Sequence, residues 1–126
     1  MPTQPATGQQ TSADPAERRK SPRYSLVTPI TVSVESAGRL TESQGTTVEL
    51  SESGVSGYLR AEIQTGQTVK VQLALPAGPV TITALVRHRM GARYGFQFVD
   101  LLPEQASHIR ASCKGSPPYR SNLPAE

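Results

Sequence analysis

The strongest constraint on the fold of this chain is an alternation of apolar and polar side chains with a period of two. Between Val69 and Leu75, for example, every second side chain is a large apolar one. This period is typical of a strand that buries one face and exposes the other. Runs of this kind lie at residues 30–35, 47–51, 55–60, 69–75, 80–87 and 94–98. The alternation therefore predicts several short strands rather than a helical fold.

Turn-forming residues separate these runs and suggest how the strands are joined. They lie at residues 37–38, 44–45, 65–66, 76–79 and 90–91. Links this short join antiparallel neighbours, and glycine or proline in each supports a turn. A sheet with one apolar face that curls on itself leaves no exposed edges. We therefore expect an all-β fold, a six-stranded antiparallel barrel.

The two ends of the chain differ from this pattern. Residues 1–17 are mainly Pro, Thr, Gln, Ala and Ser, a composition that predicts a disordered tail. Pro103 and the residues after it predict one short C-terminal α-helix that ends near Lys114, with Leu102 and Ile109 packed against one mouth of the barrel. Prolines in residues 115–126 predict a second, flexible tail, so the domain spans residues 18–114.

Charge and composition limit the class of partner. The 126 residues carry a formal net charge of only +3, but four basic side chains fall between Arg18 and Arg23. A local cluster with a weak overall excess favours a small anionic ligand over a nucleic-acid polymer. The chain has one cysteine and no apolar stretch near the ~20 residues that span a bilayer, and its first residues lack the charged start and apolar run of a signal peptide, so none is expected. We expect a cytoplasmic protein without membrane insertion.

The basic cluster supplies the first candidate ligand-binding residues, Arg19 and Arg23, which are four positions apart. A guanidinium group can bind phosphate through two parallel hydrogen bonds, and can grip guanine O6 and N7 in the same way. Pro22 restricts the backbone between the two arginines and helps to fix their separation.

A second candidate segment follows about thirty residues later, at Glu49, Ser51 and Gly54. Glu49 and Ser51 are two apart on a strand and are expected on the barrel's outer face, with Val48 and Leu50 directed into the core. The carboxylate can accept from a guanine amino group. Gly54 is expected to adopt a positive φ or to let a ligand approach closely.

In order and spacing, these segments resemble the two-part signature of PilZ domains. That signature is Arg-x-x-x-Arg followed by Asp/Asn-x-Ser-x-x-Gly, and the resemblance covers roughly residues 18–111, including the ending at residues 93–101. It implies a six-stranded antiparallel barrel with a terminal helix. It also implies binding of the bacterial second messenger cyclic di-GMP, as in many members of the family.

The resemblance assigns roles to individual residues. Arg19 and Arg23 would clamp phosphate and guanine, and Ser51 and Gly54 would form the floor and turn beneath the ligand. Arg18 lies just outside the motif and would add charge. Glu49 departs from the usual Asp or Asn, and its extra methylene adds roughly 1.5 Å of reach. One misplaced charge-assisted hydrogen bond costs on the order of 1.5–3 kcal/mol.

Two functions from different classes therefore stay open. The first is a cyclic di-GMP receptor that orders its arginine segment over the ligand and signals to a downstream protein through a changed surface. The second, which Glu49 favours, is an adaptor that keeps the barrel but binds proteins without the nucleotide. A third, a barrel that binds single-stranded RNA, is disfavoured because Tyr94, Phe96 and Phe98 share one core-facing register.

Other polar residues have structural explanations. His88 and His108 lie on different elements with no cysteine or carboxylate at metal-ligand spacing, so no metal ion is expected. Arg87, Arg89 and Arg93 surround the last turn; a basic outer face is one explanation for them, but they are expected to keep a hairpin end in solvent. Neither a catalytic constellation nor a cofactor is expected, which predicts a binding protein rather than an enzyme.

Overall fold

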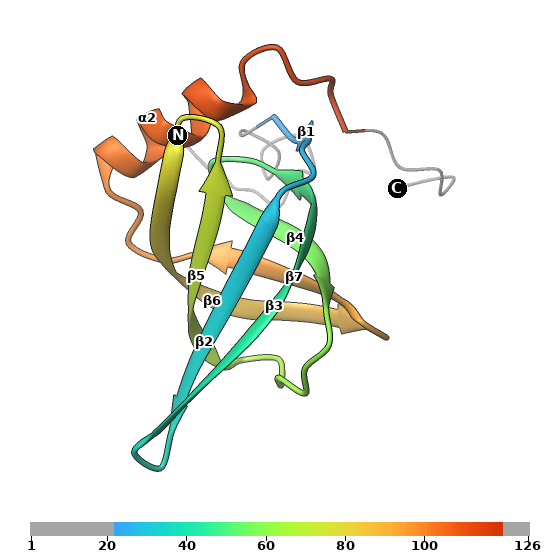
Figure 1. Ribbon diagram of the computed structural model, residues 1–126, viewed down its shortest axis with the longest axis vertical. Helices are drawn as coiled ribbons and strands as arrows, with labels where there is room; N and C mark the ends of the chain where they lie inside the picture. Colours follow the sequence, from blue (N-terminus) through green and yellow to red (C-terminus); the bar gives the residue numbers. More distant parts are fainter. Residues whose placement is uncertain (1–21, 120–126) are drawn as a thin grey trace, which may run out of the picture.

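The computed structural model describes residues 22–119, and antiparallel strands dominate them (Figure 1). The elements are β1 (Tyr24–Ser25), β2 (Pro29–Ser36), β3 (Arg39–Leu50), β4 (Gly54–Leu59), β5 (Thr68–Leu75), β6 (Gly78–Met90), β7 (Arg93–Phe98) and α2 (Pro103–Cys113). Strands pair in the order β3-β2-β5-β6-β7-β4, and β4 pairs back onto β3. The sheet therefore closes, which confirms the predicted six-stranded antiparallel barrel with one short helix.

The two-residue strand β1 pairs with the C-terminal end of β3, beyond the part of β3 that pairs with β2. Tyr24 pairs with Leu50, whereas Pro29 pairs with Thr46 further along β3. Thr28 links the two parts, because its N–H donates to the Thr47 hydroxyl and its carbonyl accepts from the Thr47 N–H, both at 2.9 Å. The pairing of β1 with β3 brings Arg23, the residue before β1, beside the C-terminal end of β3.

The alternating apolar residues fill the interior of the barrel as predicted. Val32, Val71 and Leu73 are fully buried, and full burial of such a side chain stabilises the fold by roughly 1.5–3 kcal/mol. Tyr94 and Phe96 stack with ring centroids 6.0 Å apart. The Tyr94 hydroxyl donates to the Ala61 carbonyl and accepts from the Ile63 N–H, so no buried polar group is left unpaired there. The aromatic residues of β7 therefore belong to the core.

Strand β3 begins earlier than the sequence pattern predicts. Its first half pairs with β2 in a hairpin that projects beyond the barrel, and Gln44-Gly45, predicted as a turn, lies inside the strand (Figure 1). Residues 39–42 are exposed, so this half of the strand has no buried face and shows no alternation. The tip is the predicted turn, where Ala37 and Gly38 both adopt positive φ, at 54° and 76°. Two positive φ values match the twist of a tight hairpin.

Helix α2 spans Pro103–Cys113, close to its predicted bounds. Ile109 is buried as expected, but Leu102 is 51% exposed and does not pack against the barrel. Leu102 precedes the first helical turn, and the residue before it, Leu101, contacts the core instead. The His108 ring lies 3.1 Å from the Gly78 carbonyl, a contact that ties the helix to the turn before β6. No helix within residues 22–119 is long and apolar enough to cross a membrane.

Residues 115–119, which the prolines assigned to a flexible tail, run alongside β1 and are called the C-terminal strap below. Gly115 turns the chain out of the helix with a φ of +87°. The strap then pairs with β1 through two backbone hydrogen bonds of 2.9 Å, from Ser25 N–H to the Pro117 carbonyl and from Tyr119 N–H to the Arg23 carbonyl. The predicted disordered tail, residues 1–17, lies outside the described residues.

Candidate functional site

A shallow hollow on the outer face of the barrel brings together four of the predicted ligand-binding residues. Arg23, Glu49, Ser51 and Gly54 all line it, and its volume is about 390 Å³. The other predicted residues, Arg18 and Arg19, lie outside the described residues. The described part of both motif segments therefore meets at one place, although the two segments are far apart in the sequence.

Two small residues make this part of the sheet concave. Ser56 of β4 pairs with Gly95 of β7, and both line the hollow while their neighbours Val55 and Tyr94 are buried. A Cβ atom at Gly95 would lie 2.0 Å from the ring of the exposed His88, so a larger residue there would displace the His88 side chain. A floor of this kind lets a flat ligand approach the backbone closely.

Glu49 sits at the centre of the hollow, but it is buried rather than offered openly to solvent. Its side chain is covered by two arginines, with Arg23 Nε 3.3 Å from Oε1 and Arg93 Nη2 3.4 Å from Oε2. The Ser56 hydroxyl donates to Oε2 at 3.2 Å. The Arg23 contact is an ion pair without the alignment of a hydrogen bond, so Oε1 is a buried oxygen with no hydrogen-bond donor among the described residues. A buried acceptor of this kind favours a ligand that brings an N–H group.

A β-bulge aims Glu49 at the outer face. The register between β3 and β4 shifts between Thr47 and Glu49, so Val48 is the extra residue. Val48 is only half-buried and lies outside the core cluster, and the prediction that it enters the core with Leu50 is wrong. Thr47 points inward instead, where its hydroxyl donates to the Leu26 carbonyl.

The turn between β3 and β4 is held by Ser51. Its hydroxyl accepts from the N–H groups of Ser53 at 3.1 Å and Gly54 at 3.2 Å, and its own N–H donates to the Gly54 carbonyl at 2.9 Å. Ser51 is buried, so it fixes the turn under the hollow and is not an exposed side chain as expected from strand alternation alone.

Gly54 was predicted either to adopt a positive φ or to let a ligand approach closely. It is not among the glycines with positive φ, which rules out the first of these reasons. A Cβ atom at this position would lie 2.2 Å from the Phe96 carbonyl oxygen, because β4 and β7 approach each other closely here. Gly54 therefore sets the separation of the two strands that form the floor.

A second hollow of about 360 Å³ adjoins the first and adds residues that the sequence did not indicate. The two hollows share Arg23, Glu49, Ser56, His88 and Gly95. The second extends to Arg93 and to Tyr119 of the C-terminal strap.

Arg93 and Tyr119 contact each other and the motif residues. Arg93 Nη2 donates to the Tyr119 hydroxyl at 3.1 Å, and this hydrogen bond raises the pKa of Arg93. The guanidinium carbons of Arg23 and Arg93 lie 5.7 Å and 5.9 Å from the centre of the Tyr119 ring, close enough for cation–π attraction. For Arg93, the sequence favoured a hairpin end kept in solvent over a basic outer face. Arg93 and Gly95 are two positions apart on β7, so both are expected on its outer face. This spacing was the sequence signal that could have indicated a role for Arg93 in the site.

The charges that line the two hollows are mostly positive. Arg87 lines the first, Arg89 the second, and Arg23 and Arg93 flank the shared centre, against Glu49 as the one acidic lining residue. Arg89 is partly neutralised by Glu62, which it binds at 2.9 Å and 3.1 Å. An excess of guanidinium groups around a concave surface attracts anions.

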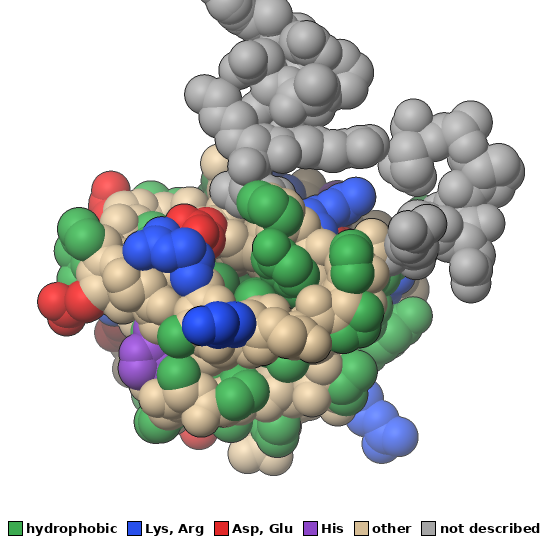
Figure 2. All heavy atoms as spheres, turned by 90° about the horizontal axis from the view of Figure 1, so that it is seen from above, with side chains coloured by type: hydrophobic (Ala, Val, Ile, Leu, Met, Phe, Trp, Pro, Cys, Tyr) green, Lys and Arg blue, Asp and Glu red, His purple; other side chains and the backbone are tan. Residues whose placement is uncertain are grey.

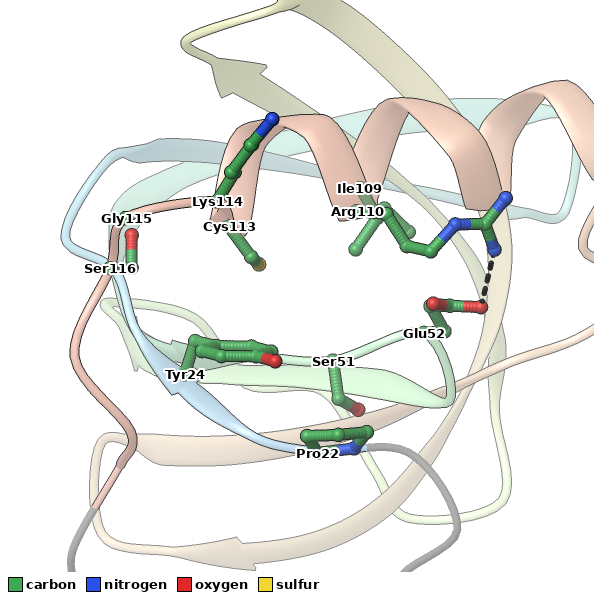
Figure 3. Close-up of a pocket in the computed structure, with 10 residues that line it drawn as sticks. All are labelled: Pro22, Tyr24, Ser51, Glu52, Ile109, Arg110, Cys113, Lys114, Gly115 and Ser116. Carbon is green, nitrogen blue, oxygen red and sulfur yellow. Dashed lines mark hydrogen bonds and ion pairs between the residues drawn. The ribbon is translucent and has the colours of Figure 1, made fainter.

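A third cavity, of about 500 Å³, lies between α2 and β1 at the end of the barrel that Figure 2 views. Ile109 and Cys113 of α2 face Tyr24 and Ser51 across it, and Arg110 pairs with Glu52 at its rim at 3.0 Å (Figure 3). Burial raises the pKa of the Cys113 thiol, which keeps it protonated and suits a packing role. Within residues 22–119 no three His, Cys, Asp or Glu side chains form a group that could hold a metal ion.

Comparisons with known proteins agree with this architecture. No curated protein matches the chain in sequence. Among solved structures, the PilZ domain of YcgR from Escherichia coli, with c-di-GMP, is 18% identical with a TM-score of 0.62, over 78% of this chain and 90% of that one. The PilZ domain of CeSA from a cellulose-synthesizing bacterium is 18% identical with a TM-score of 0.58, over 74% and 95%. Bacillus subtilis MotI (DgrA), an inhibitor of motility, is 14% identical with a TM-score of 0.64, over 78% of this chain and 50% of that one.

At these identities the structural matches show a shared fold. The sequence evidence is more specific, because the family model described as the PilZ domain matches residues 17–115, most of the chain. That range contains both motif segments and the barrel with its helix. This chain belongs to the PilZ domain family.

Proposed function

We propose that this protein is a receptor for cyclic di-GMP, which binds on the outer face of the barrel without being chemically changed. The observation that carries the proposal is the meeting of Arg23, Glu49, Ser51 and Gly54 around one hollow. The YcgR domain, whose fold this chain shares, was solved with c-di-GMP. Cyclic di-GMP is a dianion with two flat bases, and it suits a concave surface whose charged lining residues are mostly arginine.

Each side chain of the hollow has a role that suits this ligand. The Arg23 side chain is 41% exposed, so its guanidinium can turn toward a phosphate or the acceptor edge of a guanine. The buried Oε1 of Glu49 can accept from a guanine N–H group and so gain the hydrogen bond that it lacks. Ser51 and Gly54 hold the floor, and Arg93 adds a second cation beside Glu49.

The remaining parts of the proposal concern residues outside the described range and proteins outside the chain. Arg19, with Arg23, would clamp the ligand, and Arg18 would add positive charge. The segment that carries them would become ordered over the bound dinucleotide, so that the surface near it changes shape and charge for a downstream protein. The cytoplasmic location and this protein partner stay predictions.

One observation favours the alternative function, a protein-interaction adaptor that does not bind the nucleotide. Glu49 engages both Arg23 and Arg93, so two cations of the hollow already have an anionic partner. An adaptor would keep this ion-pair cluster intact. A thermal-shift titration separates the two functions, since a ligand at a hundred times its dissociation constant adds about 2.7 kcal/mol of stability.

The direct test is isothermal titration calorimetry with cyclic di-GMP, with GTP and cyclic GMP as controls for a general affinity for nucleotides. Arg23→Ala should weaken binding at least tenfold, because a charge-assisted hydrogen bond is worth roughly 1.5–3 kcal/mol. Arg39→Ala is the matched control, since Arg39 is exposed at the far hairpin and lines neither hollow. The absence of heat at high micromolar ligand, or equal affinities in both variants, would contradict the proposed site.

A further inference from the structure

The C-terminal strap, residues 115–119, is attached to the same residue that the proposed ligand needs. Arg23 offers its carbonyl to the Tyr119 N–H at 2.9 Å, while its guanidinium lies against the Tyr119 ring at 5.7 Å. Arg23 is thus held at its backbone and at its side chain by one tyrosine. A movement of Arg23 toward a ligand on the outer face disturbs both contacts.

The strap also uses a hydrogen-bond donor that an anion would compete for. Arg93 Nη2 lies 3.1 Å from the Tyr119 hydroxyl, 3.4 Å from Glu49 Oε2 and 3.3 Å from the Ser56 hydroxyl. Three acceptors therefore share one nitrogen with two hydrogens. A phosphate is a stronger acceptor for a guanidinium than a neutral phenol is, because both partners are charged.

Few contacts hold the strap in place. Its described hydrogen bonds to β1 and the barrel are the two backbone bonds to Arg23 and Ser25 and the bond between Tyr119 and Arg93. Gly115 has a φ of +87°, and no atom lies within 4 Å of the place that a Cβ atom would take there, so it gives the strap a turn at which it can swing away from the helix. Beyond these bonds, a swing at Gly115 breaks the 2.9 Å hydrogen bond from the Ser116 N–H to the Cys113 carbonyl at the end of α2.

We infer that the C-terminal strap is an internal competitor of the ligand, so that an anionic dinucleotide bound at Arg23 and Arg93 releases the strap from β1. The inference rests on the proposed function and adds its regulation. Glu49 and Tyr119 hold the two arginines in the free protein. The ligand must displace the tyrosine, and strap release and ligand binding are coupled in both directions.

Strap release would also change a second part of the surface. Gly115 and Ser116 line the cavity between α2 and β1, opposite Tyr24 (Figure 3). Because the strap swings at Gly115, Ser116 leaves the cavity wall, which opens the cavity on the side of β1 and exposes the backbone of Ser25. A bound ligand on the outer face would thereby be reported at the helical end of the barrel, which is where a protein partner would sense it.

The experiment combines calorimetry with amide hydrogen exchange on the full chain. Cyclic di-GMP is titrated into the wild type, Tyr119→Phe, Tyr119→Ala and the control Leu40→Ala, which alters an exposed residue of the far hairpin that lines neither outer hollow. Tyr119→Ala should bind on the order of tenfold more tightly, because the cation–π contacts with Arg23 and Arg93 and one hydrogen bond no longer oppose the ligand. Tyr119→Phe loses only the hydrogen bond to Arg93 and should lie between, and Leu40→Ala should bind as the wild type does.

Amide hydrogen exchange in the wild type detects strap release without any substitution. Saturating ligand should speed exchange at the Ser25 and Tyr119 amides, whereas the Thr47 amide, bonded to the Thr28 carbonyl inside the barrel, should stay protected. Weaker or equal binding by Tyr119→Ala, or unchanged protection at Ser25 and Tyr119, overturns the inference while ligand binding stands. If neither the wild type nor Tyr119→Ala binds, the proposed function fails and takes the inference with it.

Discussion

The two sides of the candidate site differ in how many contacts hold them in place. On one side, the turn from Ser51 to Gly54 is fixed by the buried Ser51 hydroxyl and by pairing of β4 with both β3 and β7. On the other side, Arg23 precedes a two-residue strand and is held mainly by the strap and by ion pairing with Glu49. The first side can define the shape of a ligand, and the second can move when the ligand arrives.

Under the proposed function, this difference lets one side of the site move while the other side keeps its shape. Local stability in a protein ranges from the global value in paired strands to near zero at lightly held segments. Ligand contacts made by a lightly held segment change its conformation, because little opposes the change. Substitutions that weaken one side at a time therefore test directly whether the two sides are held differently.

The largest effect is expected on the firm side, from Gly54→Ala. The new Cβ atom would lie 2.2 Å from the Phe96 carbonyl oxygen, so β4 and β7 must separate. We expect a loss of about 3 kcal/mol in the free energy of unfolding, at the upper end of overpacking effects. Urea denaturation measures this loss.

Gly66→Ala is the control for this substitution. Gly66 has a φ of +90° but no atom within 4 Å of the added methyl group, so only backbone strain of about 1 kcal/mol is expected. Equal losses in the two variants would mean that the close approach of β4 and β7 contributes nothing special.

A smaller effect is expected where the two sides meet, from Glu49→Gln. The substitution removes the negative charge that lies 3.3 Å from Arg23 and 3.4 Å from Arg93, but keeps the size of the side chain. Loss of one partner from a buried pair can cost about 3–5 kcal/mol, but both arginines are partly exposed, so we expect about 1–2 kcal/mol. Urea denaturation at pH 7 measures it.

Glu42→Gln serves as the control, because Glu42 is exposed on the same strand. We expect a change within about 0.5 kcal/mol there, as at most surface positions. Should Glu49→Gln be as stable as this control, the ion-pair cluster would not help to hold Arg23 in place, and the looser side would rest on the strap alone.

The sequence predicts best the strands and the helix that lie away from the candidate site. Alternation located the strand around Val69 to Leu75, and Pro103 located the helix, because both signals are local. The meeting of Arg23 with Glu49, Ser51 and Gly54 could be predicted from the family motif. The bulge at Val48 could not, since it depends on how β3 pairs with β4.

The looser side depends on contacts that no local pattern contains. Tyr119 lies in a proline-rich segment without alternation, and its position follows from backbone pairing between Arg23 and the strap. Arg93 was assigned to the end of a hairpin, and its ion pair with Glu49 forms only because β3, β4 and β7 lie side by side in the closed sheet. Both are tertiary effects, which override what a short segment indicates by itself.

The smallest predicted effect concerns Cys113, which lies in the cavity between α2 and β1 beside the strap. Burial raises the pKa of its thiol above the ordinary value of 9.0. The folded protein therefore holds this proton more tightly than the unfolded chain does. Stability from this group is fully present below pH 9.0 and is lost as pH rises through the raised pKa of the folded state.

Urea denaturation of the wild type and of Cys113→Ala at pH 8 and pH 10 measures this loss, since both pH values are roughly one unit from the thiol's ordinary pKa. The variant is needed as a reference because tyrosine and lysine side chains in general also titrate in this range. We expect the wild type to lose slightly more stability than the variant over this interval. An equal loss in the two proteins would mean that the thiol reaches water, and that the helical side of the cavity is as loosely held as the strap.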